Sequence, residues 1–153
     1  MNSKTAKFLA LSGAEKRVFL SAWLSLPLLW AGLRVLGLNR LQTWLQRISP
    51  PSRKDASAPA PPEILRLGAL VNQACAHACC PVTCLTRSLC LWWALRRRGV
   101  GSQLRIGVRF VQGELDAHAW VEYAGAPIND TPDVAGRFAA FGSALSPDNF
   151  QSP

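Results

Sequence analysis

The spacing of apolar residues changes once along this chain, at Gly99, and that change limits the fold more than any other feature. Before Gly99, apolar residues recur at helical spacing, as in the stretch TCLTRSLCLWWALRRRG. After Gly99, apolar and polar residues alternate, which is typical of strands. Helices first and strands afterwards predict an α+β fold, in which a helix packs on a small antiparallel sheet.

The stretch from Thr83 to Gly99 predicts one helix with a cysteine in its first turn. Thr83 is a suitable N-cap, Cys84 follows as the first helical residue, and Gly99 is a typical C-terminal stop. The basic run from Arg96 to Arg98 falls at the other end of this helix, where positive charge complements the helix dipole. We therefore interpret these arginines as part of the helix and predict no nucleic-acid partner.

The segments after Gly99 predict a meander of antiparallel strands. Alternation marks two strands, a turn separates them, and a third strand or strand end follows; the ranges are Leu104–Phe110, Gln112–Gly113, Leu115–Tyr123 and Pro127–Asp130. Beyond them, we expect Phe138 and Phe141 to close over an edge of the core.

The N-terminal region predicts a small helical unit over residues 1–48. The run Val18–Leu33 is apolar on almost every side, so it is either buried or in contact with lipid. A membrane-spanning helix needs about 20 apolar residues, whereas this run is shorter and is interrupted by Pro27. We favour a packed helical hairpin, whose second helix covers Arg40–Ile48, over a membrane contact.

A stretch rich in proline, serine and alanine, SPPSRKDASAPAPP, occupies residues 49–62. This composition is typical of an extended linker, so we place a domain boundary there and a second domain over residues 63–153. The second domain begins with a helix from Glu63 to about Cys79, and Pro81 ends it.

The net charge and the cysteine content indicate the kind of partner and the cellular compartment of the protein. The net charge of +8 favours an anionic partner or a membrane surface. The chain has five cysteines, all between positions 75 and 90. Because this number is odd and the residues are crowded together, they do not resemble a secreted disulfide framework, and we predict a cytoplasmic protein.

Cys84, His118 and Asp130 are the candidate catalytic residues. The positive end of a helix dipole stabilises a thiolate, which makes Cys84 a candidate nucleophile. His118 lies mid-strand on a polar face and would accept the thiol proton, while Asp130 follows a tight turn and would orient the imidazole. Simpler interpretations stay open at this point: a buried cysteine, a core histidine and a turn aspartate.

Zinc binding is the alternative use of the cysteine-rich region. The potential ligands are closely spaced: Cys75, His77, Cys79, Cys80 and Cys84. However, the CxxC pair usual in structural zinc sites is absent, and Pro81 interrupts the spacing. The chain also lacks GxxxxGK[ST] and GxGxxG motifs. We therefore predict neither a metal nor a nucleotide cofactor.

Three motifs between about Pro81 and Phe141 resemble those of the lasso peptide leader peptidases. In order, they are TCLTRSLCLWWALRRRG, LRIGVRF and LDAHAWVEYAGAPIND. That family consists of stand-alone cysteine proteases with a transglutaminase/papain-like core. The resemblance implies that Cys84 is the nucleophile, His118 the general base and Asp130 the orienting acid.

The resemblance also implies a substrate and partners. The expected substrate is a precursor peptide, cut between leader and core so that the core N-terminus is free for macrocyclisation. A RiPP recognition element acting in trans would bind the leader, and the apolar N-terminal helix would dock either this element or the lasso cyclase. Two alternatives remain: a transglutaminase-like acyltransferase, and a non-catalytic membrane-associated scaffold.

Overall fold

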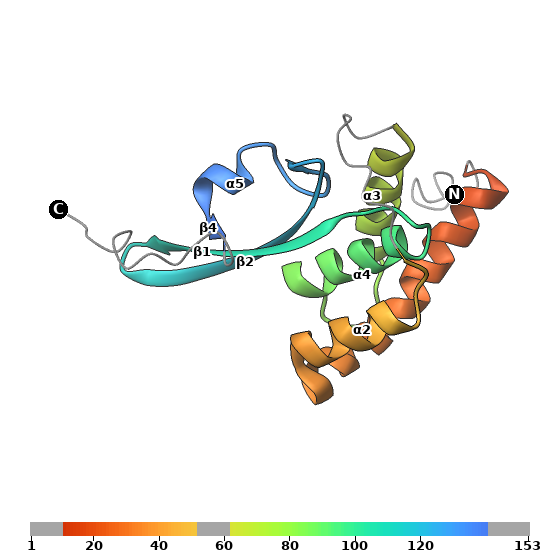
Figure 1. Cartoon of the computed structure of the whole chain (residues 1–153), viewed down its shortest axis with the longest axis horizontal. Coiled ribbons are helices and arrows are strands. Elements are labelled where there is room, and N and C mark those ends of the chain that lie inside the picture. Colours follow the sequence, from red (N-terminus) through yellow and green to blue (C-terminus); the bar gives the residue numbers. More distant parts are fainter. Residues whose placement is uncertain (1–10, 52–61, 141–153) are drawn as a thin grey trace.

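A computed structural model describes residues 11–51 and 62–140 of the chain. Helices come first and the sheet afterwards, as the sequence predicts for an α+β fold. Helices α2, α3 and α4 gather around one end of a long hairpin, and the small helix α5 lies on the side of that hairpin opposite α4 (Figure 1). In chain order the elements are α2 (Gly13–Arg47), α3 (Pro62–Cys75), α4 (Cys84–Arg96), β1 (Gln103–Val111), β2 (Glu114–Tyr123), β3 (Ala126–Pro127), α5 (Val134–Arg137) and β4 (Ala139–Ala140).

Helix α2 is a helical hairpin, as predicted. A capping box begins it: the Ser12 hydroxyl accepts from the Glu15 amide at 3.2 Å, and the Glu15 carboxylate accepts from the Ser12 amide at 2.8 Å. At Gly37 the backbone leaves helical geometry with a φ of 74°. The chain then folds back, so that a Cβ added to Gly32 would lie 3.0 Å from Leu41 Cδ1. The doubled-back ribbon is visible in Figure 1.

The two arms of α2 share a hydrophobic core with the elements that follow. Buried members of this core come from α2, α3, α4 and β2, and include Leu26, Leu45, Val71, Leu89, Leu95 and Val121. The N-terminal helical unit therefore packs directly on the helices after it. The boundary placed at residues 49–62 stays a prediction, and residues 52–61 lie outside the described residues.

The described strands form one antiparallel sheet in the order β3-β2-β1-β4. Two tight turns connect β1 to β2 and β2 to β3. In the first, Gln112 and Gly113 have φ of 53° and 84°; in the second, Ala124 and Gly125 have φ of 51° and 79°. Two successive residues with positive φ match the right-handed twist of a hairpin, so the turn predicted at Gln112–Gly113 is confirmed.

Helix α3 is shorter than predicted. It ends at Cys75 rather than near Cys79. Its last turn tightens, because the His77 amide donates to the Ala74 carbonyl and the Ala78 amide to the Cys75 carbonyl, both three residues back. Cys79 therefore lies outside the helix, and the predicted end of this helix near Cys79 is wrong.

The third strand is also shorter than predicted. β3 covers Ala126–Pro127, and residues 128–130 form a bend. One more ladder-like bond follows, from the Ile128 amide to the Val121 carbonyl at 3.0 Å. At the next position, the side chain of Asn129 rather than its backbone bonds to β2, and this ends the strand. Asp130 is therefore placed by a bend and not by a strand.

The face of the sheet opposite α4 is covered by the segment around α5. Trp120, Val134 and Phe138 form a small second core there. Phe138 lies very close to β1, because a Cβ added to Gly107 would meet Phe138 Cβ at 2.8 Å and Trp120 Cη2 at 2.9 Å. The expected closure by Phe138 is confirmed, whereas Phe141 lies outside the described residues.

Candidate active site

Helix α4 presents Cys84 at its N-terminus. Thr83 has extended backbone geometry, and its hydroxyl accepts from the Thr86 amide at 3.2 Å, which confirms the predicted cap. Cys84 is the first helical residue and is partly buried, with a free thiol. Within the described residues, no hydrogen bond engages the amides of Cys84 and Leu85. The helix therefore directs two unpaired N–H groups and its positive end toward the space beside the sulfur.

Strand β2 mounts His118 next to Asp130. His118 Nε2 lies 2.7 Å from Asp130 Oδ2, and the two side chains are 22% and 13% exposed. The His118 ring also stacks on Phe138, with ring centroids 5.1 Å apart. Since Asp130 occupies Nε2, the Nδ1 nitrogen is the one left to exchange a proton with another group.

Asp130 is surrounded by groups that favour its ionised form. Its carboxylate also accepts from the Thr131 amide at 2.8 Å and lies 3.5 Å from Arg87 and 4.0 Å from Arg137. Burial raises the pKa of Asp130. The hydrogen bonds from His118 and Thr131 and the charge of Arg87 lower this pKa by more than burial raises it, so the net shift is downward. Asp130 therefore stays a carboxylate at neutral pH and holds the His118 ring in one orientation.

A buried hydrogen-bond network joins α4 to β2 behind this pair. Asn129 Oδ1 accepts from the Val121 amide at 2.8 Å, and Asn129 Nδ2 donates to Ser88 Oγ at 3.0 Å. The Ser88 hydroxyl in turn donates to the Ala119 carbonyl at 2.8 Å. Both Ser88 and Asn129 are buried. The network fixes the helix that carries Cys84 against the strand that carries His118.

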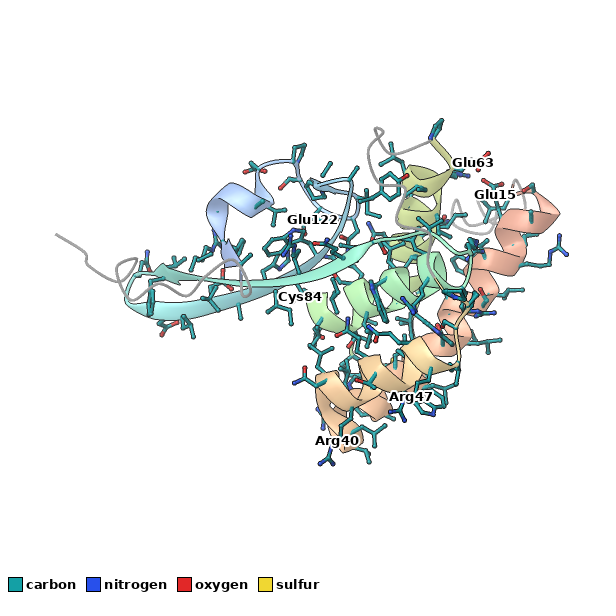
Figure 2. All side chains as sticks on the ribbon, in the orientation of Figure 1. Glu15, Arg40, Arg47, Glu63, Cys84 and Glu122 are labelled. Atoms are coloured by element: carbon teal, nitrogen blue, oxygen red, sulfur yellow. The ribbon has the colours of Figure 1, made fainter. Side chains whose placement is uncertain are left out.

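The structure brings two of the three predicted residues, His118 and Asp130, into contact. His118 and Asp130 are hydrogen-bonded, and Arg87, three residues after Cys84, connects α4 to Asp130. Within the described residues, no hydrogen bond joins Cys84 to His118. Figure 2 shows Cys84 at the end of α4 that lies under the hairpin. Sequence reasoning missed Asn129, Ser88 and Arg87; the only available signal was their position beside Asp130 and Cys84.

The other polar residues on the same face of β2 form ion pairs with β1. Arg109 lies 2.8 Å from Asp116, and Arg105 lies 2.9 Å from Glu122. Glu122 also accepts from the Trp120 indole at 2.8 Å. These pairs satisfy the carboxylates within the sheet, so His118 is distinguished by its contact with an acid from outside the β1–β2 hairpin.

Three of the other cysteines, Cys75, Cys79 and Cys90, have surroundings unlike those of Cys84. Burial raises the pKa of the Cys75 thiol to about 12 and also raises the pKa of Cys90, so both stay protonated at neutral pH. Cys79 is exposed and lies outside any helix. Across residues 11–51 and 62–140, no group of three or more His, Cys, Asp and Glu side chains is arranged to hold a metal ion.

His77, the second histidine, takes part in packing. Its ring lies 6.3 Å from that of Phe19, and its carbonyl accepts from the Trp23 indole at 2.8 Å. The arginines at the far end of α4 also have local roles: Arg97 stacks on Trp93, and Arg98 donates to the Ala94 carbonyl at 2.8 Å. These contacts agree with the helix-end interpretation of the basic run.

Helix α4 thus begins at a cysteine and packs on an antiparallel sheet, and His118 on strand β2 of this sheet is paired with Asp130. The chain belongs to the Transglutaminase-like superfamily, whose family profile matches residues 27–143. The match begins inside α2 and runs past β4, so it includes the second part of the N-terminal unit. A comparison with curated proteins finds no match, and neither does a comparison with solved structures.

Proposed function

We propose that this protein is a cysteine peptidase that removes the leader from a lasso peptide precursor, with Cys84, His118 and Asp130 as its catalytic residues. The observation that carries the proposal is the 2.7 Å pair between His118 and Asp130, on a sheet packed against the helix that begins at Cys84. Membership of the superfamily supports a cysteine-dependent enzyme. The resemblance of the motifs between Pro81 and Phe141 to leader peptidases supports the particular substrate.

In the first half-reaction, the Cys84 thiolate attacks the carbonyl carbon of the scissile peptide bond. A C–S bond forms and the carbonyl oxygen becomes an oxyanion. The unpaired amides of Cys84 and Leu85 are suited to stabilise this charge, because they lie at the start of the same helix. His118, protonated by the thiol, then gives its proton to the leaving amine as the C–N bond breaks, and a thioester remains.

In the second half-reaction, His118 removes a proton from water, which attacks the thioester. The C–S bond breaks, the leader leaves with a new carboxyl group, and Cys84 returns to its starting state. Asp130 keeps His118 Nε2 occupied throughout, so Nδ1 handles the proton in both half-reactions. The released amine is the N-terminus of the core peptide.

Acyl transfer to an amine is the second candidate, because the superfamily includes acyltransferases as well as peptidases. The same three residues would then form a thioester with a glutamine side chain, with release of ammonia, and an amine would replace water in the second step. Incubating the protein with precursor peptide and the recognition protein, followed by mass spectrometry of the products, separates the two. Separate leader and core peptides, whose masses add up to that of the precursor plus one water, support the peptidase. A cross-linked product formed with loss of ammonia contradicts it.

A pair of cysteine variants tests the nucleophile. Cys84→Ala should abolish cleavage, while Cys79→Ala removes an exposed thiol outside α4 and should cleave at the wild-type rate. If Cys84→Ala cleaves the precursor like the wild type, the nucleophile assignment is wrong, and a non-catalytic scaffold becomes the better description.

The surface proposed to dock the recognition protein is an exposed stripe of α2. It consists of Leu20, Leu24 and Leu28, which are 45%, 61% and 74% exposed. These residues are spaced four apart and lie on one side of the helix. Deleting α2 is a poor test, because its other side contributes to the core. Leu24→Ser with Leu28→Ser should instead weaken binding of the recognition protein, measured by calorimetry, and leave the fold intact.

The same helix is long and apolar enough to cross a membrane by length and composition alone, although its apolar window is partly buried in the core. Co-sedimentation with vesicles of anionic lipid distinguishes a lipid contact from protein docking. Binding to vesicles that the Leu24→Ser, Leu28→Ser variant loses would assign the stripe to a membrane surface and would also contradict a purely cytoplasmic protein.

A further inference from the structure

The outer half of the β1–β2 hairpin presents an open strand edge. In β2, the backbone groups of Val121 point away from β1, because its carbonyl accepts from Ile128 and its amide donates to Asn129. Backbone direction alternates along a strand, so the groups of Ala119, Ala117 and Leu115 point to the same edge. The Ala119 carbonyl is used by Ser88. Within the described residues, no strand pairs with this edge at Ala117 and Leu115.

The same part of the hairpin carries an exposed apolar face. Phe110 and Leu115 are opposite each other in the β1–β2 register and are 67% and 60% exposed. Val108 and Ala117 form the next pair on this face. The outer half of the hairpin extends past the end of α4 (Figure 2). We call these four residues the hairpin-tip face.

The open edge is continuous with the proposed catalytic residues. Ser88 bonds to the Ala119 carbonyl, and Cys84 lies one helical turn before Ser88, about 6 Å along α4. Ala117 lies two residues before Ala119, about 7 Å along β2, and His118 lies between them. A chain bonded to the edge at Ala117 would therefore run toward Cys84.

We propose that the outer edge of β2 binds the substrate as an added strand, with alternate apolar side chains of the substrate resting on the hairpin-tip face. The inference rests on the proposed peptidase function and deepens it. The occupant is an extended peptide, because the edge offers backbone donors and acceptors two residues apart, which only another extended backbone can match. Its apolar residues recur at every second position, because only alternate side chains of a strand face Phe110 and Leu115.

An N-methyl scan tests the backbone part of the proposal. A library of fluorogenic peptides with alternating apolar and polar residues is screened with the wild-type protein, and one cleaved peptide is resynthesised with a methyl group on each amide in turn. Methylation of the amides that donate to β2 should raise KM by roughly threefold to tenfold, and methylation of the intervening amides should change it by less than about twofold. An effect without this period of two would overturn the strand-addition proposal and leave the peptidase intact.

Paired substitutions test the side-chain part. Phe110→Ser with Leu115→Ser should raise KM for the same peptide by roughly tenfold and leave kcat within about twofold, since apolar contact is lost away from the reacting bond. Val35→Ser is the matched control, because Val35 is 80% exposed in α2, away from the hairpin. A wild-type KM in the double variant would overturn the role of the hairpin-tip face.

Two further outcomes are decisive. Failure of the wild-type protein to cleave any peptide of the library would count against the peptidase function and the edge proposal together. A second copy of the chain is the other occupant that an open edge can take. If Phe110→Ser with Leu115→Ser converts a dimer into a monomer in analytical ultracentrifugation while KM is unchanged, the edge is an interface between copies, and the substrate proposal is wrong.

Discussion

The two halves of the β1–β2 hairpin have the same strand pattern but opposite surroundings. The inner half, Gln103–Gly107 paired with His118–Glu122, lies between α4 on one face and the segment around Phe138 on the other. The outer half, from Val108 to Ala117, extends beyond α4 with apolar residues exposed. The two halves meet at His118, which is half-buried. The candidate site therefore lies where the sheet leaves the protein core.

Helix α4 is shorter than strand β2, and this difference in length explains why only one half of the hairpin is covered. The 13 residues of α4 span about 20 Å, whereas the 10 residues of β2 span about 33 Å. The hairpin extends past the end of α4, so the outer half of the strand is left without cover by this helix (Figure 1). A covered half can hold a catalytic group rigidly, and an uncovered half can accept a ligand. The comparison leads to four predictions about what each half contributes.

The largest effect should come from the residue at the junction of the two halves. His118→Ala should lower kcat/KM for precursor cleavage by about 10²–10⁴-fold, because it removes the proposed proton carrier. Asp116→Ala, two residues away on the same face of the outer half, is the matched control and should retain activity. The measurement is the initial rate of leader release by mass spectrometry, and comparable losses in both variants would contradict a catalytic role for His118.

The inner half should dominate stability. Trp120 is fully buried and contacts His118 and Phe138, so Trp120→Ala should lower the free energy of unfolding by about 3–5 kcal/mol. Leu115→Ala, in the outer half of the same strand, should change this free energy by less than about 0.5 kcal/mol. Urea denaturation followed by tryptophan fluorescence or circular dichroism checks both values. A large loss for Leu115→Ala would show that the outer half is packed.

A smaller effect is expected for the network that fixes α4 to β2. Asn129→Ala leaves the Val121 amide and the Ser88 hydroxyl with fewer buried partners, which should cost about 1–3 kcal/mol of unfolding free energy. It should also lower kcat more than it raises KM, since the helix of Cys84 would shift relative to His118. Asn129→Asp keeps the acceptor for Val121 and should recover part of the stability. Full activity in Asn129→Ala would contradict a positioning role.

The smallest effect is a pH dependence from Asp130. Its folded-state pKa lies below the ordinary value of 3.8, so its carboxylate stabilises the fold above about pH 4. That contribution is lost as the pH falls through the folded-state pKa, where Asp130 takes up a proton. The difference in unfolding free energy between the wild type and Asp130→Asn should therefore be larger at pH 7 than near pH 3. A difference that is constant across this range would contradict the proposed ionic contacts.

Local signals were enough to predict the elements that carry the site. The Thr83 cap, the start of α4 at Cys84 and the turn at Gln112–Gly113 each depend on two or three neighbouring residues, and the structure has all of them. The hairpin of α2 was also predicted, with its second helix at Arg40–Ile48, and the structure has the break in helical geometry at Gly37. The sequence also indicated that Asp130 would lie beside His118, although it placed Asp130 on a third strand or strand end, where the structure has a bend.

Features that depend on tertiary contacts could not be predicted. Asn129 looks like an ordinary turn residue, and only the packing of α4 on β2 makes it a buried bridge to Ser88. The early end of α3 has no proline at the point where the helix stops. Alternation gave both halves of the hairpin the same pattern, and only the position of α4 shows which half is covered.

Gly107 sets how closely the C-terminal segment can lie over the candidate site. It pairs with His118 in the register, and any side chain there would collide with Phe138 and Trp120. A larger residue would lift Phe138 off the sheet, and the His118 imidazole would lose its stacking partner and some of its shielding from water. A position without a side chain thus controls the polarity around the proposed proton carrier. Even Gly107→Ala would therefore change the surroundings of His118 while leaving the proposed catalytic residues in the sequence.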